Sequence, residues 1–536
     1  MRHRLLPVNE LDRRTFLTLA GMATAASLAR PLELFGQAPI DVEEMTIAMM
    51  QDGMRSGRFT ARKLAELYLG RIDAMDKRGP AINAMIELNP DALSIADSLD
   101  AERKAGRTRG PMHGIPIVIK DNIDTADRMH TTAGSLALAD SIASRDAHVV
   151  KRLREAGAVI LGKTNLSEWA NFRSTHSSSG WSARGGLTRN PYALNRNACG
   201  SSTGTGAAIA ANFAAVGVGT ETDGSVVCPS SSNGLVGLKP TVALVSRSGI
   251  IPISHSQDTA GPMARTVTDA AILLGAMTGI DSLDTVTATS RKHVSADYTQ
   301  FLDANGLRGA RIGVARGSFG FSDAVDRVMT EAIETIRNLG ATIVDPANLE
   351  TQGKFDDSEF EVLLCEFKAD LNAYLAALSP NVKSRTLADL IKFNEDNRAQ
   401  EMPYFGQEIF TMAEKKGPLT DAAYKKALAK NHRLARAEGI DATMKKHKLD
   451  AVIAPTGGPA WTTDLINGDH YTGGYSSASA VAGYPHITVP AGTVAGLPVG
   501  LSFFGGAWSE GALFKYAFAF EQATKARKPP QFLASV

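Results

Sequence analysis

Apolar positions recur along the chain in two spacings, which predict helices alternating with strands. Between residues 60 and 77 the side chains of Leu64, Tyr68 and Ile72 form a helical stripe, and Thr60 precedes it as an N-cap. Further helices are predicted at 91–105, 146–156, 207–215, 325–339 and 510–525. Short apolar runs predict strands at 82–88, 115–119, 158–161, 311–315, 341–344, 450–455, 486–490 and 498–504. This alternation predicts an α/β fold in which helices flank a large central sheet, mixed and mostly parallel.

A change of composition from about residue 358 to 446 predicts several helices without intervening strands. Glycines are few there and charged residues are many, with lysines gathered between 421 and 446. A charged run of this kind is typically the solvated face of a helix. No stretch from 39 to 536 has the composition of a linker, so we expect these residues to fold as a single compact domain.

The N-terminal residues differ from the rest of the chain. Asp12-Arg13-Arg14-Thr-Phe-Leu17 is followed by an apolar, alanine-rich run to about Leu28, which resembles a twin-arginine (Tat) export signal. The run is too short to span a bilayer of about 30 Å, so stable membrane insertion is not expected. We expect residues 1–38 to be the signal and the enzyme to be periplasmic or secreted. Cleavage near Ala38 is uncertain because Pro39 follows it, and an uncut basic leader is the alternative.

Composition and charge indicate which kinds of partner to expect. With 44% hydrophobic residues and a net charge of +1, the chain is long enough for a large core and favours neither nucleic acid nor an anionic membrane surface. The three cysteines are Cys199, Cys228 and Cys365, and an odd number argues against a disulfide framework. No cysteine or histidine pair has metal-ligand spacing. We therefore expect small, buried packing cysteines, no metal, and a small-molecule or peptide partner.

Three glycine-rich or apolar motifs carry the candidate chemistry. The loop Asn197–Gly206 enters a helix of small residues, and the turn within Gly217–Pro229 carries Ser225. Glycine turns of this kind align backbone N–H groups around an anion. In Gly114–Asp121 an apolar strand ends on Lys120, where loss of solvation lowers the pKa of an amine. Two hydroxyl-bearing turns that flank one helix indicate an acyl-transfer site.

These motifs resemble those of the amidase signature family from about residue 42 to the end of the chain. Lys120, Ser201 and Ser225 match its Ser-Ser-Lys triad, with Ser225 24 positions after Ser201. Three runs are similar to the bacterial peptide amidase branch: Glu221-Thr-Asp-Gly-Ser225, Gly237-Leu-Lys-Pro-Thr241 and Gln257-Asp-Thr-Ala-Gly-Pro-Met263. Asp223 stands where many other members have a glycine; the peptide amidase branch shares this aspartate, and we expect it to narrow the pocket beside the oxyanion hole.

The resemblance implies roles for these residues. Ser225 is expected to be the nucleophile, Ser201 to pass its proton, and neutral Lys120 to accept it. The implied oxyanion donors are the backbone N–H groups of Thr222, Asp223, Gly224 and Ser225, and Gly200 and Ser202 are expected to support the loop. No cofactor is implied. The helical insertion at about 358–446 is expected near the substrate cleft.

One alternative keeps hydrolysis but changes the fold and the site. Gly200–Gly204 also fits the nucleophile elbow of α/β-hydrolases, with Ser202 as nucleophile and Asp450 with His470 or His486 as partners. That interpretation leaves Lys120 and Ser225 without a function.

The substrate and the partner also leave choices open. Carboxamides, especially C-terminal peptide amides, are the preferred substrates, while small aliphatic or aryl amides, anilides, esters and carbamates remain open. A glutaminase subunit of a tRNA-dependent amidotransferase and a non-catalytic exported binding protein are also considered. The loop 174–180 is either a pocket wall or a solvated turn. Monomer and homodimer are not distinguished.

Overall fold

The computed structural model describes residues 40–536, and residues 42–536 form one compact unit. The predicted export signal, residues 1–38 with cleavage near Ala38, lies outside the described residues. Within the described range, no helix has both the length and the apolar content that a membrane span requires.

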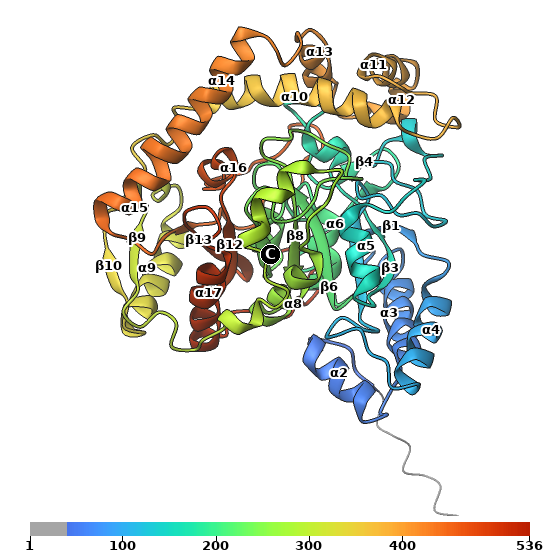
Figure 1. Cartoon of the computed structure of the whole chain (residues 1–536), viewed down its shortest axis with the longest axis horizontal. Coiled ribbons are helices and arrows are strands. Elements are labelled where there is room, and N and C mark those ends of the chain that lie inside the picture. The colour runs from blue at the N-terminus through green and yellow to red at the C-terminus, as the bar shows by residue number, and fades with distance from the viewer. Residues whose placement is uncertain (1–39) are drawn as a thin grey trace, which may run out of the picture. The chain divides into compact units, whose positions relative to one another are not determined.

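An eleven-stranded sheet forms the centre of this unit (Figure 1). In spatial order its strands are β1 (Met85–Leu88), β3 (Val159–Thr164), β2 (Pro116–Lys120), β6 (Val216–Glu221), β8 (Thr259–Ala264), β7 (Val236–Lys239), β12 (His486–Val494), β13 (Leu497–Phe504), β11 (Ala451–Pro455), β9 (Arg311–Val314) and β10 (Thr342–Val344). Strand β2 pairs in parallel with β3 and β6, and β9 pairs in parallel with β10 and β11. The other neighbours are antiparallel.

The predicted mixed α/β fold is confirmed, although antiparallel pairs outnumber parallel ones in the described sheet. Strands β12 and β13 are joined by the two residues Ala495 and Gly496, and both have positive φ. So short a connection makes a hairpin, because parallel strands need a crossover of a dozen or more residues. Apolar runs alone do not distinguish these two arrangements.

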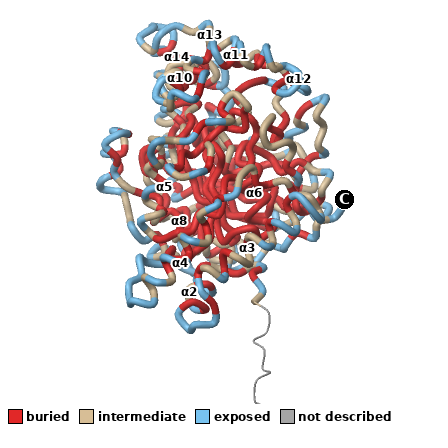
Figure 2. Tube along the Cα trace, turned by 90° about the vertical axis from the view of Figure 1, so that its right-hand side faces the viewer, coloured by how far each residue is buried: buried red, intermediate tan, exposed pale blue. Residues whose placement is uncertain are grey.

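Helices surround the sheet, and most follow the predicted ranges. They are α2 (Ile47–Arg55), α3 (Ala61–Met75), α4 (Ala92–Lys104), α5 (His148–Glu155), α6 (Thr203–Ala210), α7 (Val227–Ser232), α8 (Val267–Met277), α9 (Asp323–Asn338), α16 (Ser477–Ala482) and α17 (Glu510–Thr524). Thr60 caps α3 as predicted, because its hydroxyl accepts from the amide of Lys63. Helix α6 begins four residues before the predicted start, so the serine-rich loop leads directly into it. Figure 2 shows the buried residues gathered in the interior, with exposed residues at the periphery.

The helices predicted between 358 and 446 are present. They are α10 (Asp356–Ala376), α11 (Leu387–Asp396), α12 (Arg398–Glu401), α13 (Glu408–Glu414), α14 (Ala422–His432), a π-helical stretch (Arg433–Ile440) and α15 (Asp441–His447). Helices α10 to α14 lie along one side of the sheet (Figure 1). They pack on loops and short helices beside the sheet through an aromatic cluster in which Phe367 lies 5.0 Å from Phe172 and 5.3 Å from Phe410 between ring centroids. Burying each such ring contributes about 1.5–3 kcal/mol.

A buried charge cluster also joins the helical segment to the sheet side. Arg173 is fully buried, pairs with Glu168, and lies 3.5 Å from the carboxylate of Glu401 in α12. Its guanidinium is 4.4 Å from the ring centroid of Phe405 and also donates to the carbonyl of Glu401 at 2.6 Å. Burial and the second carboxylate raise the pKa of Glu168 well above its usual value. The cluster fixes the short 3-10 helix η2 (Glu168–Asn171), which borders the candidate site.

Candidate active site

Lys120 ends strand β2 and is completely buried. Its Nζ lies 2.8 Å from Ser201 Oγ and 2.8 Å from Thr220 Oγ1, and Asn122 Nδ2 donates to the same threonine hydroxyl at 3.0 Å. Burial lowers the pKa of Lys120 to about 7, and the carboxylates of Asp258 and Glu221 only partly oppose this shift. A large fraction of the amine is therefore neutral near pH 7 and able to accept a proton.

Ser201 lies in the loop between Gly200 and helix α6, and the Gly200–Ser201 peptide bond is cis. A side chain at Gly200 has no room, because a Cβ there would lie 2.3 Å from Ser167 Oγ. Ser202 anchors the loop to strand β6: its hydroxyl donates to the carbonyl of Thr220 at 3.1 Å and accepts from the amide of Thr220 at 3.2 Å. These contacts hold the hydroxyl of Ser201 next to the amine.

The turn 222–225 follows strand β6 and presents free amides. None of its four backbone N–H groups donates to an acceptor anywhere in residues 40–536. Gly224 has φ +79°, which favours glycine. The buried carboxylate of Glu221 accepts from the amides of Val226 and Val227 at 2.7 and 3.0 Å. These two hydrogen bonds fix the residues that directly follow the turn. Such a fixed set of unmet donors is suited to an oxyanion.

Ser225 is only partly connected to the other two predicted catalytic residues. Its carbonyl accepts from the amide of Ser202 at 3.2 Å, which brings the two loops together. The hydroxyl of Ser225, however, makes no hydrogen bond with any described residue, and the side chain is partly exposed. The structure thus brings Lys120 and Ser201 into direct contact and places the main chain of Ser225 beside them.

Two cavities are lined by residues of these loops. The first cavity is lined by Asn122, Ser201, Thr222, Ile253, Asp258 and Asp370, among others. The second cavity is lined by Gly200, Asp223, Gly224, Trp461, Asp469 and Tyr471, among others. Ala170 and Asn171, with φ of 54° and 69°, line the first and the second cavity respectively. Ser179 of the loop 174–180 lines the second cavity, so the pocket-wall interpretation of that loop is the correct one.

Several residues of the site were not identified from the sequence. The Thr220 hydroxyl accepts hydrogen bonds from the Lys120 amine and from the Asn122 side-chain amide. Asp258 accepts from the hydroxyl of Thr222 at 2.5 Å. Burial raises the pKa of Asp258 to about 6. Asp258 lies in the run Gln257–Met263, which carried the family resemblance but no predicted role.

The prediction that Cys199 and Cys228 are unpaired packing residues was wrong. They form a disulfide that lines the second cavity and packs on Trp461, and Cys365 is the free, buried cysteine. The odd number of cysteines concealed the pair, and the 29-residue separation does not reveal that the two loops meet.

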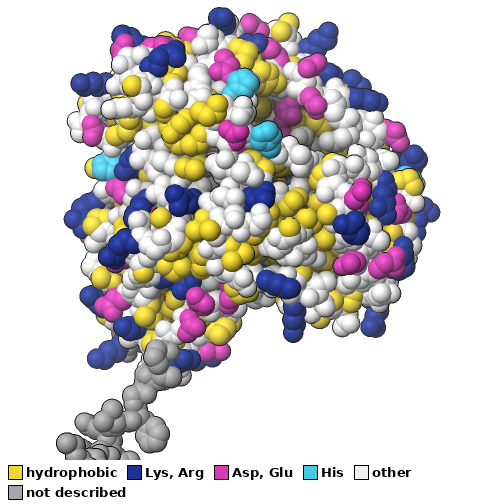
Figure 3. Space-filling model, turned by 180° about the vertical axis from the view of Figure 1, so that it is seen from behind, with side chains coloured by type: hydrophobic (Ala, Val, Ile, Leu, Met, Phe, Trp, Pro, Cys, Tyr) yellow, Lys and Arg dark blue, Asp and Glu magenta, His cyan; other side chains and the backbone are white. Residues whose placement is uncertain are grey.

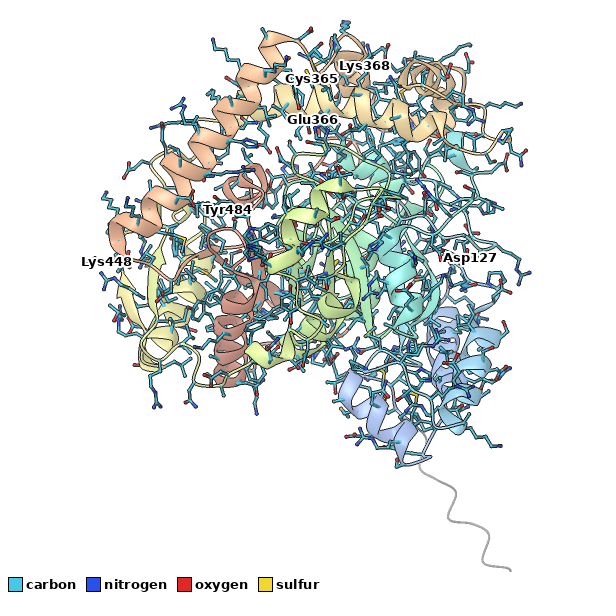
Figure 4. All side chains as sticks on the ribbon, viewed as in Figure 1. Asp127, Cys365, Glu366, Lys368, Lys448 and Tyr484 are labelled. Atoms are coloured by element: carbon cyan, nitrogen blue, oxygen red, sulfur yellow. A yellow bond between two sulfur atoms is a disulfide. The ribbon has the colours of Figure 1, made fainter. Side chains whose placement is uncertain are left out.

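One group of side chains has the composition of a metal site. The potential ligand atoms of His255, Glu366 and Asp370 lie within 4.8 Å of one another. Each already has protein partners: His255 Nδ1 is 2.8 Å from Asp370, and Glu366 accepts from the hydroxyls of Ser254 and Tyr424. Glu366 lies on α10 (Figure 4). The group therefore connects α10 to the loop beside the first cavity, and it needs no ion to do so.

Comparison with known proteins identifies the family. Residues 63–514 match the family model described as Amidase. The chain is 43% identical to a probable amidase of Arabidopsis thaliana over 97% of each chain, and 34% identical over 92% of this chain and 99% of the relative to a subunit of the glutamyl-tRNA(Gln) amidotransferase of Thermoanaerobacter pseudethanolicus. The crystal structure of the native peptide amidase of Stenotrophomonas maltophilia superposes with a TM-score of 0.88 at 51% identity, covering 92% of this chain and 100% of that one. The family predicted from the motifs is confirmed: this chain belongs to the amidase family and is an amide-hydrolysing enzyme.

Proposed function

We propose that the enzyme hydrolyses unsubstituted carboxamides, above all the C-terminal amides of peptides, through an acyl-enzyme on Ser225. The observation that carries this proposal is the buried amine of Lys120, 2.8 Å from Ser201 Oγ, beside a turn whose four amides have no acceptor in the described chain. The likeness to the peptide amidase supports the choice of substrate.

In the proposed reaction, Ser225 Oγ attacks the carbonyl carbon while its proton passes to Ser201 and the proton of Ser201 passes to Lys120. The carbonyl oxygen becomes an oxyanion that accepts from the amides of residues 222–225. When the C–N bond breaks, the proton returns from Lys120 through Ser201 to the departing nitrogen, which leaves as ammonia. Water then attacks the ester by the same route and releases the carboxylic acid, so the amine ends as it began.

The role of the remaining polar groups follows from their contacts. Thr220 Oγ1 lies 2.8 Å from the amine and Asn122 orients that hydroxyl, so the lone pair of a neutral Lys120 is directed to Ser201. Anilides, esters and carbamates follow the same steps with another leaving group. The structural likeness to the peptide amidase favours the unsubstituted amide among these.

Residues 1–38 are proposed as a twin-arginine export signal, and residues 39–536 as the mature enzyme. The disulfide Cys199–Cys228 supports this proposal, because disulfides persist in oxidising compartments outside the cytoplasm. Cell fractionation and the intact mass of the purified protein test it. A cytoplasmic protein that retains Met1 would contradict it.

The proposed reaction is tested by ammonia release from a panel of peptide amides, anilides, esters and carbamates. We expect turnover of peptide amides by the chain alone and loss of turnover in Ser225→Ala and Lys120→Ala. A fluorophosphonate probe should label the wild type but not Ser225→Ala. Activity that appears only together with a partner protein would favour an amidotransferase function, which the name of the Thermoanaerobacter relative states for that protein. Loss of turnover confined to Ser202→Ala would favour the nucleophile elbow.

A further inference from the structure

The second cavity has acidic and aromatic walls. Asp223 and Asp469 contribute carboxylates, and Trp461 and Tyr471 contribute rings whose centroids lie 5.7 Å apart in an edge-to-face arrangement. No lysine, arginine or histidine is among the described residues that line it. The wider surface does not share this bias: acidic and basic side chains are interspersed on the face shown in Figure 3, and the net charge is +1.

Neither carboxylate has a cationic partner. The Oδ2 atom of Asp223 accepts from Ser477 Oγ at 2.6 Å, whereas its Oδ1 atom is buried without a hydrogen bond. Asp469 accepts from the amide of Ser179 at 3.0 Å and from the indole N–H of Trp461 at 3.3 Å. Among residues 40–536, no lysine, arginine or histidine nitrogen forms an ion pair with either aspartate. Burial raises the pKa of both carboxyl groups, and the cations that oppose this shift, Lys239 for Asp223 and His470 for Asp469, act without forming an ion pair.

A second acceptor in the same wall also lacks a donor. The Oδ1 atom of Asn171 is buried without a partner, while its Nδ2 donates to Ser179 Oγ at 3.2 Å. Buried acceptors without partners are uncommon, because each one forfeits a hydrogen bond that water would supply. Asp223 Oδ1 and Asn171 Oδ1 lie beneath the surface of the lining, so they add negative partial charge to this wall without being open to direct contact by a ligand.

The charges behind this wall are also mainly acidic. Glu359, in the first turn of α10, is buried and lies near enough to Asp223 that repulsion between the two carboxylates raises its pKa further. Glu359 accepts from Gln257 Nε2 at 2.9 Å. Lys239 opposes this charge from a fully buried position outside the cavity lining, where it donates to the carbonyl of Pro240. A ligand cation in the cavity would relieve the repulsion.

We propose that the second cavity is a subsite for a cationic group on the acyl part of the substrate, and that Asp223 and Asp469 determine this specificity. The substrates are then carboxamides that carry an ammonium or guanidinium group near the scissile carbonyl. This inference rests on the proposed function: when the leaving group is ammonia, whatever fills a cavity beside residues 223–224 belongs to the acyl part. The rings of Trp461 and Tyr471 add cation–π attraction to that of the carboxylates.

The test compares two amides that differ in one charged group, Nα-acetyl-lysinamide and Nα-acetyl-norleucinamide. For the wild type we expect kcat/KM to favour the lysine amide by about tenfold or more, and added salt to reduce the preference. Asp223→Asn and Asp469→Asn should each bring the ratio toward one. The ratio is the measured quantity, so a general loss of activity in a variant cancels. Asp370→Asn, which removes an acid from the first cavity, is the matched control and should keep the wild-type ratio.

Binding to the inactive Ser225→Ala variant separates the two proposals. Calorimetry should show tighter binding of the lysine amide than of the norleucine amide, and loss of this difference when Asp469→Asn is added. A wild-type ratio at or below one, or a ratio that both asparagine variants leave unchanged, would overturn the subsite. If the wild type hydrolyses neither amide, the proposed function fails, and the difference in binding still decides whether the cavity selects cations.

Discussion

The disulfide between Cys199 and Cys228 lends itself to a quantitative test, because it joins the loop before Ser201 to helix α7, which follows the turn that carries Ser225. The perturbation is the double variant Cys199→Ser/Cys228→Ser. In the chain-entropy model, closing a loop of 29 residues stabilises the folded state by about 3.6 kcal/mol at 25 °C. For a chain of about 500 ordered residues the unfolding entropy is about 1 kcal/mol/K, so Tm should fall by about 3–4 °C. Scanning calorimetry measures this shift.

The same variant should lose activity well below its melting temperature. Without the bond, the two loops are joined by the hydrogen bond from the Ser202 amide to the Ser225 carbonyl, and the alignment of nucleophile and proton carrier becomes less exact. We expect kcat at 25 °C to fall about tenfold, with KM changed less. The control is Cys365→Ser, which removes the free thiol on α10 and should keep the wild-type kcat (Figure 4). If the double variant has the Tm and the kcat of the wild type, the disulfide neither stabilises the fold nor aligns the two serines, and the reasoning is refuted.

The buried charges lead to three further predictions. Because the pKa of Lys120 is about 7 and only the neutral amine accepts a proton, kcat/KM should rise with pH through about 7 and then level, falling about a hundredfold by pH 5; a flat pH–rate profile from 5 to 9 would contradict this. The lowered pKa of Lys120 also means that the unfolded chain binds the proton more readily than the folded chain. Lys120→Met should therefore raise the free energy of unfolding, measured by denaturant titration, by about 1–3 kcal/mol at pH 7 or below, and this gain should vanish as pH approaches 10.5. No gain at pH 7 would argue that the amine is well solvated. Glu221→Ala removes the acceptor of the Val226 and Val227 amides, so the turn 222–225 should lose order. Steady-state kinetics should then show kcat reduced by about 10–100-fold with KM little changed. An unchanged kcat would mean that the turn keeps its conformation without the Glu221 carboxylate.

Local patterns along the sequence predicted most elements and part of the site. The apolar run ending on Lys120 indicated a buried strand-terminal amine, and the structure places this amine in contact with Ser201. Thr60 and the stripe after it indicated α3. These features depend on neighbours a few residues apart, and the family motifs supplied the pairing of residues farther apart.

What the sequence did not reveal depends on contacts between distant segments. The disulfide, the contact of Thr220 with Lys120, and the pairing of the central strands each join residues that no spacing rule connects. The cavities are likewise formed by several loops at once, from Asn171 to Tyr471. Their acidic lining was therefore not evident from a chain whose net charge is only +1.

The buried cluster of Glu168, Arg173 and Glu401 constrains any attempt to exchange parts between relatives. A chimera that imports residues 356–447 from another amidase without an acid at position 401 would leave the guanidinium with one carboxylate partner fewer in a site shielded from water. Glu168 still pairs with the guanidinium in such a chimera, but the amide of Leu136 and the hydroxyl of Ser135 lose their acceptor, which typically costs about 1–3 kcal/mol for each buried donor left unmet. Recombination designs should therefore take Glu168, Arg173 and the helices of residues 356–447 from the same parent, or replace the whole cluster with apolar side chains of similar volume.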